Sequence, residues 1–438
     1  MFESPPSAPA VADIHAWTRS LTDVGRDVSN RERIDQLRAL EELSCAVAAA
    51  QARISVDFDE SRRCEQRTRG AEPSEIGCGV AAELALARRV SPARATRQLA
   101  VDRAVVRDLP HAFAAMRGGK LSGWRATLLA RETACLSADD RRRVDAELCA
   151  DVERLESLGD RRLAAEARRL AAKLDPRSMV ERARRAESER TVTIRPAPDT
   201  MCYLTALLPV AAGVGAYAAL VAAADSARAT GDPRSRGQIM GDTLVGRIRQ
   251  GEAIHPGLPS VTIGLVMTDQ TLLAGSDDAA EVEGYGPIPG ELAHELVARA
   301  TEAHEVTWLR RLYTSPTSGE LVNLDDQPIG FRKGVVRLIR LRDRTCRTPW
   351  CDAPIRHTDH VLARRRGGKG TRDNGQGLCE SCNYTKEALG WTARPRPGPG
   401  GHVVDITTPT GHRYTSRPPA LTAPRWTQTE PGLWTLAG

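Results

Sequence analysis

The stretch CRTPWCDAPIRHTDHVLARRRGGKGTRDNGQGLCESCN, residues 346–383, holds two close pairs of cysteines on either side of an Asp-His dipeptide. The four cysteines are Cys346, Cys351, Cys379 and Cys382. Two such pairs, a few tens of residues apart, can place four thiolates around one tetrahedral zinc ion. Free thiols or two disulfides are the alternatives, and disulfides are uncommon in a chain without a secretion signal. The spacing therefore predicts a structural zinc site that holds together a segment too small to bury its own core.

Hard donors lie between and beside the cysteines. Asp359 and His360 occupy a short β-branched run, and Asn383 follows the last cysteine directly. We expect the zinc to bring the helix that begins near Asn383 close to the strand that carries Asp359 and His360. Carboxylate and amide oxygens suit Mg²⁺ or Mn²⁺, and an imidazole can act as a general base. A strand-end carboxylate, a structural histidine and a helix cap are the structural alternatives for these residues.

This segment resembles the HNH (ββα-metal) nuclease domain, in its form with a four-cysteine zinc site, over about residues 342–391. The resemblance implies that His360 is the general base and that Asp359 and Asn383 hold a divalent catalytic ion, Mg²⁺ or Mn²⁺. It also implies that Asn374 matches the middle asparagine, which orients the loop in that family, although Asn374 before glycine is also a common turn former. The function implied is a metal-dependent endonuclease that hydrolyses DNA phosphodiester bonds.

Positive charge is concentrated around the same segment. Residues 331–400 contain 16 Lys and Arg against 6 Asp and Glu, a net charge of +10 that leaves −4 for the rest of the chain. Such a concentration is typical of nucleic-acid binders, although a solvated basic face has the same composition. We expect DNA as the partner and phosphate contacts from Arg364, Arg365, Arg366, Lys369 and Lys386. Because a double-strand break with one site per chain usually needs two chains, a homodimer is a further expectation.

A non-catalytic, zinc-stabilised DNA-binding module is the alternative function for this segment. Binding alone would not require Asp359, His360 and Asn383 together, so their joint presence favours an enzyme. The last motif position is Asn rather than His, and Ala363 stands where the family often has proline. These departures remove no catalytic group, but they leave the substrate preference open.

The rest of the 438-residue chain has room for one or two more domains. Apolar residues at helical spacing predict a mainly α region, with helical segments over residues 30–61, 74–109, 122–131 and 138–174. The second segment is divided at Ser91-Pro92, where serine can cap the helix that proline begins. After Arg190, β-branched runs predict strands that alternate with helices near residues 210–226 and 236–250, another helix from Pro289 and a β-hairpin over residues 308–324. The fold class is therefore multidomain: mainly α, then α+β, then the small zinc-stapled domain and a short C-terminal β-hairpin.

Two stretches outside the cysteine-rich segment point to a second family. GKLSGWRATLLARETACLS, residues 119–137, and TDQTLLAGSDDAAEVEGYGPIPGELA, residues 268–293, resemble the domain of unknown function that precedes HNH domains in many actinobacterial proteins. The resemblance covers most of residues 30–310 and implies no mechanism. The predicted parts are a poorly ordered N-terminus (1–29), this domain (30–325), the HNH domain (335–393), and a linker, β-hairpin and tail (394–438).

Residues 200–224 carry no charge and are long enough to cross a bilayer. They are rich in Ala and Gly, contain Pro209, and are flanked by Asp199 and Asp225 rather than by Lys or Arg. We therefore predict a short strand and a buried helix, a cytoplasmic protein and no membrane partner. We interpret the scattered cysteines as small buried hydrophobic residues without a chemical role: Cys45, Cys64, Cys78, Cys135, Cys149 and Cys202.

Overall fold

The computed structural model describes residues 9–23, 25, 27–252, 264–274, 276–302, 312–314, 319–324, 331–396, 401–421, 426–430 and 433–436. Contacts divide the chain into two compact units, and each is described by itself. The first comprises Met1–Asp57 and Ala100–Asp175, and the second comprises Phe58–Leu99 and Pro176–Gly438. Helices α2 (Asn30–Thr68) and α4 (Pro92–Asp108) contribute residues to both units.

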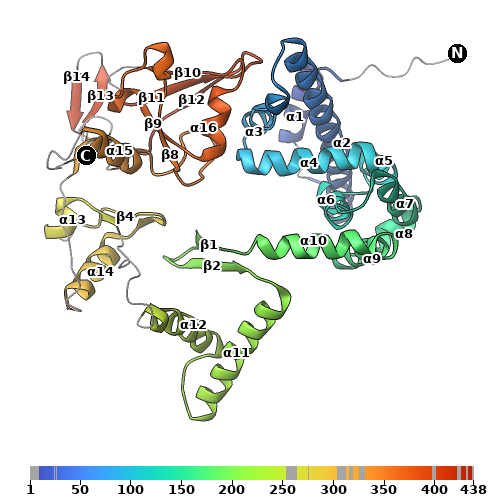
Figure 1. Ribbon diagram of the computed structural model, residues 1–438, viewed down its shortest axis with the longest axis horizontal. Helices are drawn as coiled ribbons and strands as arrows, with labels where there is room; N and C mark the ends of the chain where they lie inside the picture. The colour runs from blue at the N-terminus through green and yellow to red at the C-terminus, as the bar shows by residue number, and fades with distance from the viewer. Residues whose placement is uncertain are drawn as a thin grey trace. The chain divides into compact units, whose positions relative to one another are not determined.

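The first unit is helical, as its periodicity predicts (Figure 1). Besides parts of α2 and α4 it contains α1 (Val11–Ser20), η1 (Leu21–Asp23), α5 (Pro110–Arg117), α6 (Gly123–Glu132), α7 (Ala138–Cys149), α8 (Val152–Ser157) and α9 (Asp160–Leu174). The side chains of Ser122, Ser137 and Asp151 accept a backbone N–H at the starts of α6, α7 and α8, which satisfies donors that no helical carbonyl reaches. Leucines fill the core: Leu109, Leu121, Leu129, Leu148, Leu155 and Leu163.

Helix α1 lies within residues 1–29, where the sequence predicts poor order. Its first turn is held by Asp13, whose carboxylate accepts the N–H of Ala10 at 2.7 Å. None of its side chains is buried, so local capping rather than packing accounts for the helix. Residues 1–8 lie outside the described part of the chain.

The second unit begins with the end of α2, η2 (Pro73–Glu75), α3 (Val80–Arg88) and the start of α4, and continues at α10 (Pro176–Ser188). Small antiparallel sheets and helices follow: β1 (Thr191–Pro196), β2 (Cys202–Leu207), α11 (Val210–Ala229), α12 (Arg236–Glu252), β3 (Leu265–Val266), α13 (Asp269–Ala274), β4 (Ala280–Val282), β5 (Gly286–Ile288), α14 (Gly290–Glu302), β6 (Leu312–Thr314) and β7 (Leu321–Leu324). β1 pairs with β2, β4 pairs with both β3 and β5, and β6 pairs with β7. The predicted β-hairpin over residues 308–324 lies partly outside the described residues.

Helix α11 is not buried, which contradicts the sequence prediction. Of its described side chains only Ala224 is buried, and Val210, Val214 and Tyr217 are exposed. By length and composition it is the one helix among the described residues that could cross a membrane, and 6% of its most apolar window is buried. The prediction was wrong because an apolar sequence does not reveal which surface, if any, covers it.

The scattered cysteines also differ from the prediction. Cys45 and Cys149 are buried as expected, and Cys135 is half-buried. Cys64 on α2, Cys78 in the turn before α3 and Cys202 on β2 are exposed. The interpretation as buried hydrophobic residues therefore holds for only part of the set.

The C-terminal part of the second unit contains α15 (Phe331–Asp343), β8 (His357–His360), η3 (Arg364–Arg366), η4 (Arg372–Asn374), β9 (Gly375–Leu378), α16 (Glu380–Glu387), β10 (Thr392–Arg396), β11 (Val403–Thr407), β12 (Arg413–Ser416), β13 (Trp426–Glu430) and β14 (Leu433–Leu436). β8 pairs with β9, so that His357 faces Leu378 and His360 faces Gly375. β10, β11 and β12 form a three-stranded sheet, and β13 pairs with β14 (Figure 1). Arg394, where the sequence predicts a linker, lies within β10 because its strand pairs with β11.

A buried ion-pair network joins these elements. The side chains of Arg342, Asp343 and Arg347 are 3%, 0% and 2% exposed. Asp343 accepts from both guanidinium groups and from the backbone N–H of Gly377 on β9. Arg347 also donates to the hydroxyl and the carbonyl oxygen of Ser416 on β12. Removing Asp343 would leave two buried guanidinium groups without their carboxylate, a change that typically costs about 3–5 kcal/mol of folding free energy. The network therefore holds α15, β9 and β12 together.

Candidate functional site

The four cysteines of the quoted stretch converge on one point. Their sulfur atoms all lie within 4.8 Å of one another. Cys346 and Cys351 come from the loop between α15 and β8, where the backbone N–H of Cys346 bonds to Ala353 and that of Cys351 to Thr348. Cys379 caps the N-terminus of α16, and Cys382 lies in the first turn of that helix. Two tight turns therefore present two sulfurs each to the same small volume.

The spacing of the sulfurs fits a tetrahedral metal rather than disulfides. Cys351 Sγ lies 3.7 Å from the sulfurs of both Cys379 and Cys382. A zinc ion with Zn–S bonds of about 2.3 Å separates its ligands by about 3.8 Å at tetrahedral angles. Hydrogen bonds with Cys346 and Cys351 raise the pKa of the Cys382 thiol, and burial raises it further. Negative charges on sulfurs this close would also repel one another. A bound divalent cation would remove that cost, and the cluster suggests zinc binding.

The strand β8 and the helix α16 carry the three predicted chemical residues. Asp359 and His360 are the last two residues of β8, and Asn383 lies in α16 immediately after Cys382. Residues in β8 contact residues in α16, and the cysteine cluster joins α16 to the loop that leads into β8. All three side chains are half-buried. The structure thus brings together residues that lie 24 positions apart in the sequence.

Two of these side chains have unused polar atoms. Within the described part of the chain, neither His360 Nε2 nor Asn383 Oδ1 has a hydrogen-bond partner, although both atoms are buried. A buried acceptor without a partner costs about 1–3 kcal/mol, so it needs a compensating ligand. Asn383 Oδ1 and the Asp359 carboxylate offer the hard oxygen atoms that Mg²⁺ and Mn²⁺ prefer. The donor set therefore fits a divalent cation.

Lys386 lies against the same carboxylate. Its ammonium contacts Asp359 Oδ2, donates to the carbonyl oxygen of His360 at 2.6 Å and lies 3.1 Å from Glu387 Oε1. Its side chain is only 10% exposed. The sequence predicts Lys386 as a phosphate ligand, and the structure places it between α16 and β8, within the candidate site rather than on an open surface.

Asn374 holds the loop that follows β8. Its side-chain oxygen accepts the N–H of Leu362 at 2.8 Å, and its amide donates to the carbonyl oxygens of Leu362 and Lys369 at 3.1 and 2.9 Å. A Cβ on Gly368 would clash with the carbonyl of Leu362, so this tight arrangement requires glycine there. Asn374 touches backbone atoms of the loop, which is the contact expected of a residue that positions it.

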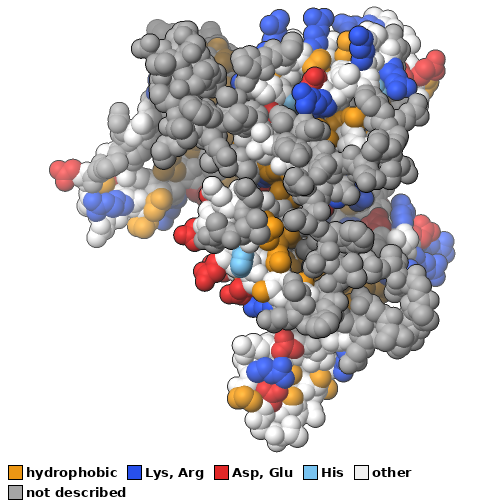
Figure 2. Space-filling view, turned by 90° about the vertical axis from the view of Figure 1, so that its left-hand side faces the viewer, with side chains coloured by type: hydrophobic (Ala, Val, Ile, Leu, Met, Phe, Trp, Pro, Cys, Tyr) orange, Lys and Arg blue, Asp and Glu red, His pale blue; other side chains and the backbone are white. Residues whose placement is uncertain are grey.

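The basic loop is exposed. Arg364, Arg366 and Lys369 are accessible to solvent, whereas the side chain of Arg365 lies outside the described part of the structure. Figure 2 shows that Lys and Arg side chains gather along the upper part of one face of the molecule. Exposed cations beside a strand end can contact a polyanion without reading its sequence.

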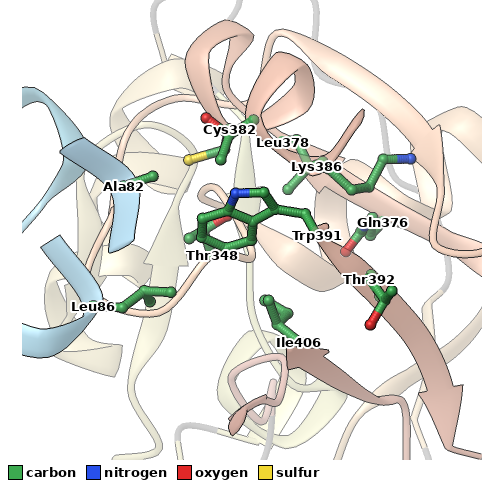
Figure 3. Close-up of a pocket in the computed structure, with 12 residues that line it drawn as sticks. Ala82, Leu86, Thr348, Gln376, Leu378, Cys382, Lys386, Trp391, Thr392 and Ile406 are labelled. Atoms are coloured by element: carbon green, nitrogen blue, oxygen red, sulfur yellow. The ribbon is translucent and has the colours of Figure 1, made fainter. Parts of the chain in front are cut away.

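A mainly apolar pocket lies beside the cysteine cluster and Lys386. Figure 3 shows the Trp391 indole beside Ala82 and Leu86 of α3, with Cys382 and Lys386 also on its wall. Trp391, Ala82 and Leu86 form a buried cluster, to which Ile406 of β11 packs. The sequence analysis missed this contact because it joins segments about 300 residues apart and has no local periodicity. We assign the pocket to packing behind α16.

Comparison with known families agrees with both resemblances found in the sequence. Residues 37–319 match the family described as a domain of unknown function (DUF222), and residues 345–389 match the family described as HNH endonuclease. No curated protein and no solved structure matches the chain. The four-cysteine cluster lies inside the second match. Because the first match covers well over half of its residues, the chain belongs to the DUF222 family, and it carries an HNH endonuclease domain after that region.

Proposed function

We propose that the protein is a metal-dependent endonuclease that hydrolyses DNA phosphodiester bonds at Asp359, His360 and Asn383. The observation that carries the proposal is the convergence of these residues at the junction of β8 and α16, with His360 Nε2 and Asn383 Oδ1 free of partners among the described residues. An HNH endonuclease match over the same residues supports nuclease chemistry. A module that only bound DNA would have no need to bury these unpaired polar atoms.

The two proposed metal sites have different tasks. Cys346, Cys351, Cys379 and Cys382 would hold zinc in a closed tetrahedral shell, which leaves no coordination position for substrate. Asp359 and Asn383 would hold Mg²⁺ or Mn²⁺. When bound, that ion would supply Lewis-acid stabilisation of the charge that develops on the scissile phosphate. The zinc therefore supports the geometry, and the oxygen site supports the reaction.

The protein residues supply the remaining steps. His360 Nε2 accepts a proton from the attacking water as the new oxygen–phosphorus bond forms and the bond to the leaving oxygen breaks. Asn374 positions the loop after β8 through its three backbone hydrogen bonds. Arg364, Arg365, Arg366 and Lys369 hold neighbouring phosphates, and these contacts give affinity that falls with salt. Cleavage of both strands of a duplex would use two chains.

Plasmid nicking by the full-length protein in Mg²⁺ or Mn²⁺ tests this proposal. We expect His360→Ala to lose at least about 100-fold in rate, the usual contribution of a general base, while it keeps its zinc. His357→Ala is the matched control, because it removes an imidazole from the other end of β8. Wild-type protein that binds DNA with a steep salt dependence but never nicks it would contradict the proposal and favour a non-catalytic binding module.

A further inference from the structure

We propose that Lys386 competes with the divalent ion for the Asp359 carboxylate, so that the ion binds only when the lysine side chain leaves. The inference rests on the proposed function, because it concerns the same oxygen site. In this proposal Lys386 controls access of the ion to Asp359, whereas the sequence predicts only a contact with phosphate.

The contacts of Lys386 resemble the surroundings of a bound cation. Its ammonium meets only oxygen atoms in the contacts described: the carboxylate of Asp359, the carbonyl of His360 at 2.6 Å and the carboxylate of Glu387 at 3.1 Å. The side chain is 10% exposed, and Asp359 is 28% exposed. A charge enclosed to this extent is screened weakly by water, so the lysine is a strong competitor for its carboxylate partner.

Helix geometry places this competitor beside the second oxygen donor. Asn383 and Lys386 are three residues apart on α16 and therefore lie on the same face of the helix. Within the described residues, Lys386 already contacts Asp359, whereas Asn383 Oδ1 has no partner. An ion held by both Asp359 and Asn383 would lie close to the ammonium in a partly buried site. Two cations this close to one carboxylate repel each other, so binding of the ion favours departure of the lysine side chain.

Displacement would give Lys386 a second task. Its four-carbon side chain is flexible, and an ammonium released from Asp359 can bind a phosphate oxygen instead. DNA would then stabilise the displaced lysine, and so it would raise the affinity of the site for the ion. By thermodynamic reciprocity the ion would raise the affinity for DNA by the same factor. The exchange would link metal loading to the presence of substrate.

Titration of zinc-loaded, full-length protein with Mn²⁺ in the absence of DNA tests the inference without an activity measurement. The free Mn²⁺ is followed by electron paramagnetic resonance. We expect Lys386→Met to bind Mn²⁺ at least about tenfold more tightly than wild type, because the competing charge is gone. Lys369→Met is the matched control: it removes the same charge from the exposed loop, where screening should keep the change below about threefold. Asp359→Ala added to Lys386→Met should abolish the gain.

The outcomes are distinct. Unchanged or weaker Mn²⁺ binding by Lys386→Met overturns the competition, and so does an equal gain in Lys369→Met, which would reflect net charge alone. If no variant binds Mn²⁺ while all keep their zinc, the oxygen site of the proposed function fails together with this inference. If wild type nicks DNA with Mn²⁺ but Lys386→Met shows no gain in affinity, only the inference fails. Circular dichroism and zinc content report folding, and Lys386→Gln serves as a second variant.

Discussion

The sulfur cluster and the Asp359–His360–Asn383 site lie side by side but are built in opposite ways. Cys382 and Asn383 are neighbours in α16, yet one joins four sulfurs that are all within 4.8 Å, and the other has a buried oxygen without a partner among the described residues. The sulfur cluster has a complete set of ligands and offers no place for substrate. The oxygen site has a buried donor atom without a partner among the described residues, and the Lys386 ammonium lies against its carboxylate. The difference shows how a small domain can separate stability from chemistry.

The largest expected effect comes from breaking the sulfur cluster. Cys382→Ser should abolish zinc binding and unfold residues 345–389, because in small zinc domains the metal supplies about 10–16 kcal/mol of apparent folding free energy. Zinc content by mass spectrometry and hydrogen exchange over β8, β9 and α16 measure the two effects. Cys202→Ser, which changes an exposed thiol in β2, is the control and should keep its zinc. A folded HNH region in zinc-free Cys382→Ser would show that the cluster is dispensable.

A smaller effect should follow from loosening the loop after β8. Asn374→Ala removes three hydrogen bonds and leaves Leu362 N–H without its side-chain acceptor, a change worth about 1–3 kcal/mol when buried. We expect slower nicking, unchanged zinc content and greater protease sensitivity at residues 362–369. Asn374→Asp keeps the acceptor for Leu362 but turns a buried carboxylate oxygen toward two carbonyl oxygens, so it should be impaired at least as much as alanine. Equal nicking by all three proteins would rule out a positioning role.

A further effect, similar in size to that of Asn374→Ala, concerns pH. Burial, with help from Arg342 and Arg347, lowers the pKa of His402 to about 4. In the unfolded chain the pKa is about 6.5, so between about pH 6.5 and 4 the unfolded state binds the additional proton. The free energy of unfolding should therefore fall as the pH drops through this window, by up to about 3 kcal/mol. It should be independent of His402 above that window.

Thermal unfolding from pH 7.5 to 4.5 measures this slope. His402→Gln places a neutral amide beside the arginine network and should show a shallower loss of stability over the same range. The cysteine cluster responds to acid in both proteins, so the difference between the two curves isolates His402. Parallel curves would mean that His402 is not held neutral by its surroundings.

Sequence reasoning identified the residues of the candidate site but not the contact that Lys386 makes with Asp359. The pairing of cysteines and the Asp-His and Asn positions are local patterns, and the structure brings these residues together. The contact between Lys386 and Asp359 was missed because it depends on how α16 packs against β8, which no spacing rule gives. The same holds for the network of Asp343, whose partners lie in α15, the following loop and β9.

For the fold, too, local patterns were predicted correctly and contacts between distant residues were not. Periodicity predicted most helices of the first unit, although the helical segment predicted over residues 138–174 is divided into α7, α8 and α9. It failed for α11, where an apolar composition suggested burial and the helix is exposed. The linker predicted from Arg394 was also wrong at its start. The prediction came from a Pro-rich composition, whereas pairing with β11 makes this segment a strand. Burial and strand pairing are properties of partners distant in the sequence.

We propose that zinc stabilises the fold of the HNH domain, and that a second, exchangeable ion supports the cleavage of DNA with His360 as the general base. The most direct measurement is plasmid nicking by protein treated with a mild chelator, assayed before and after addition of Mn²⁺, with zinc counted in the same samples. The account predicts about one zinc per chain throughout and nicking only after Mn²⁺ is added. Nicking at full rate by the chelator-treated, zinc-only protein, or nicking that rises and falls with zinc content alone, would contradict it.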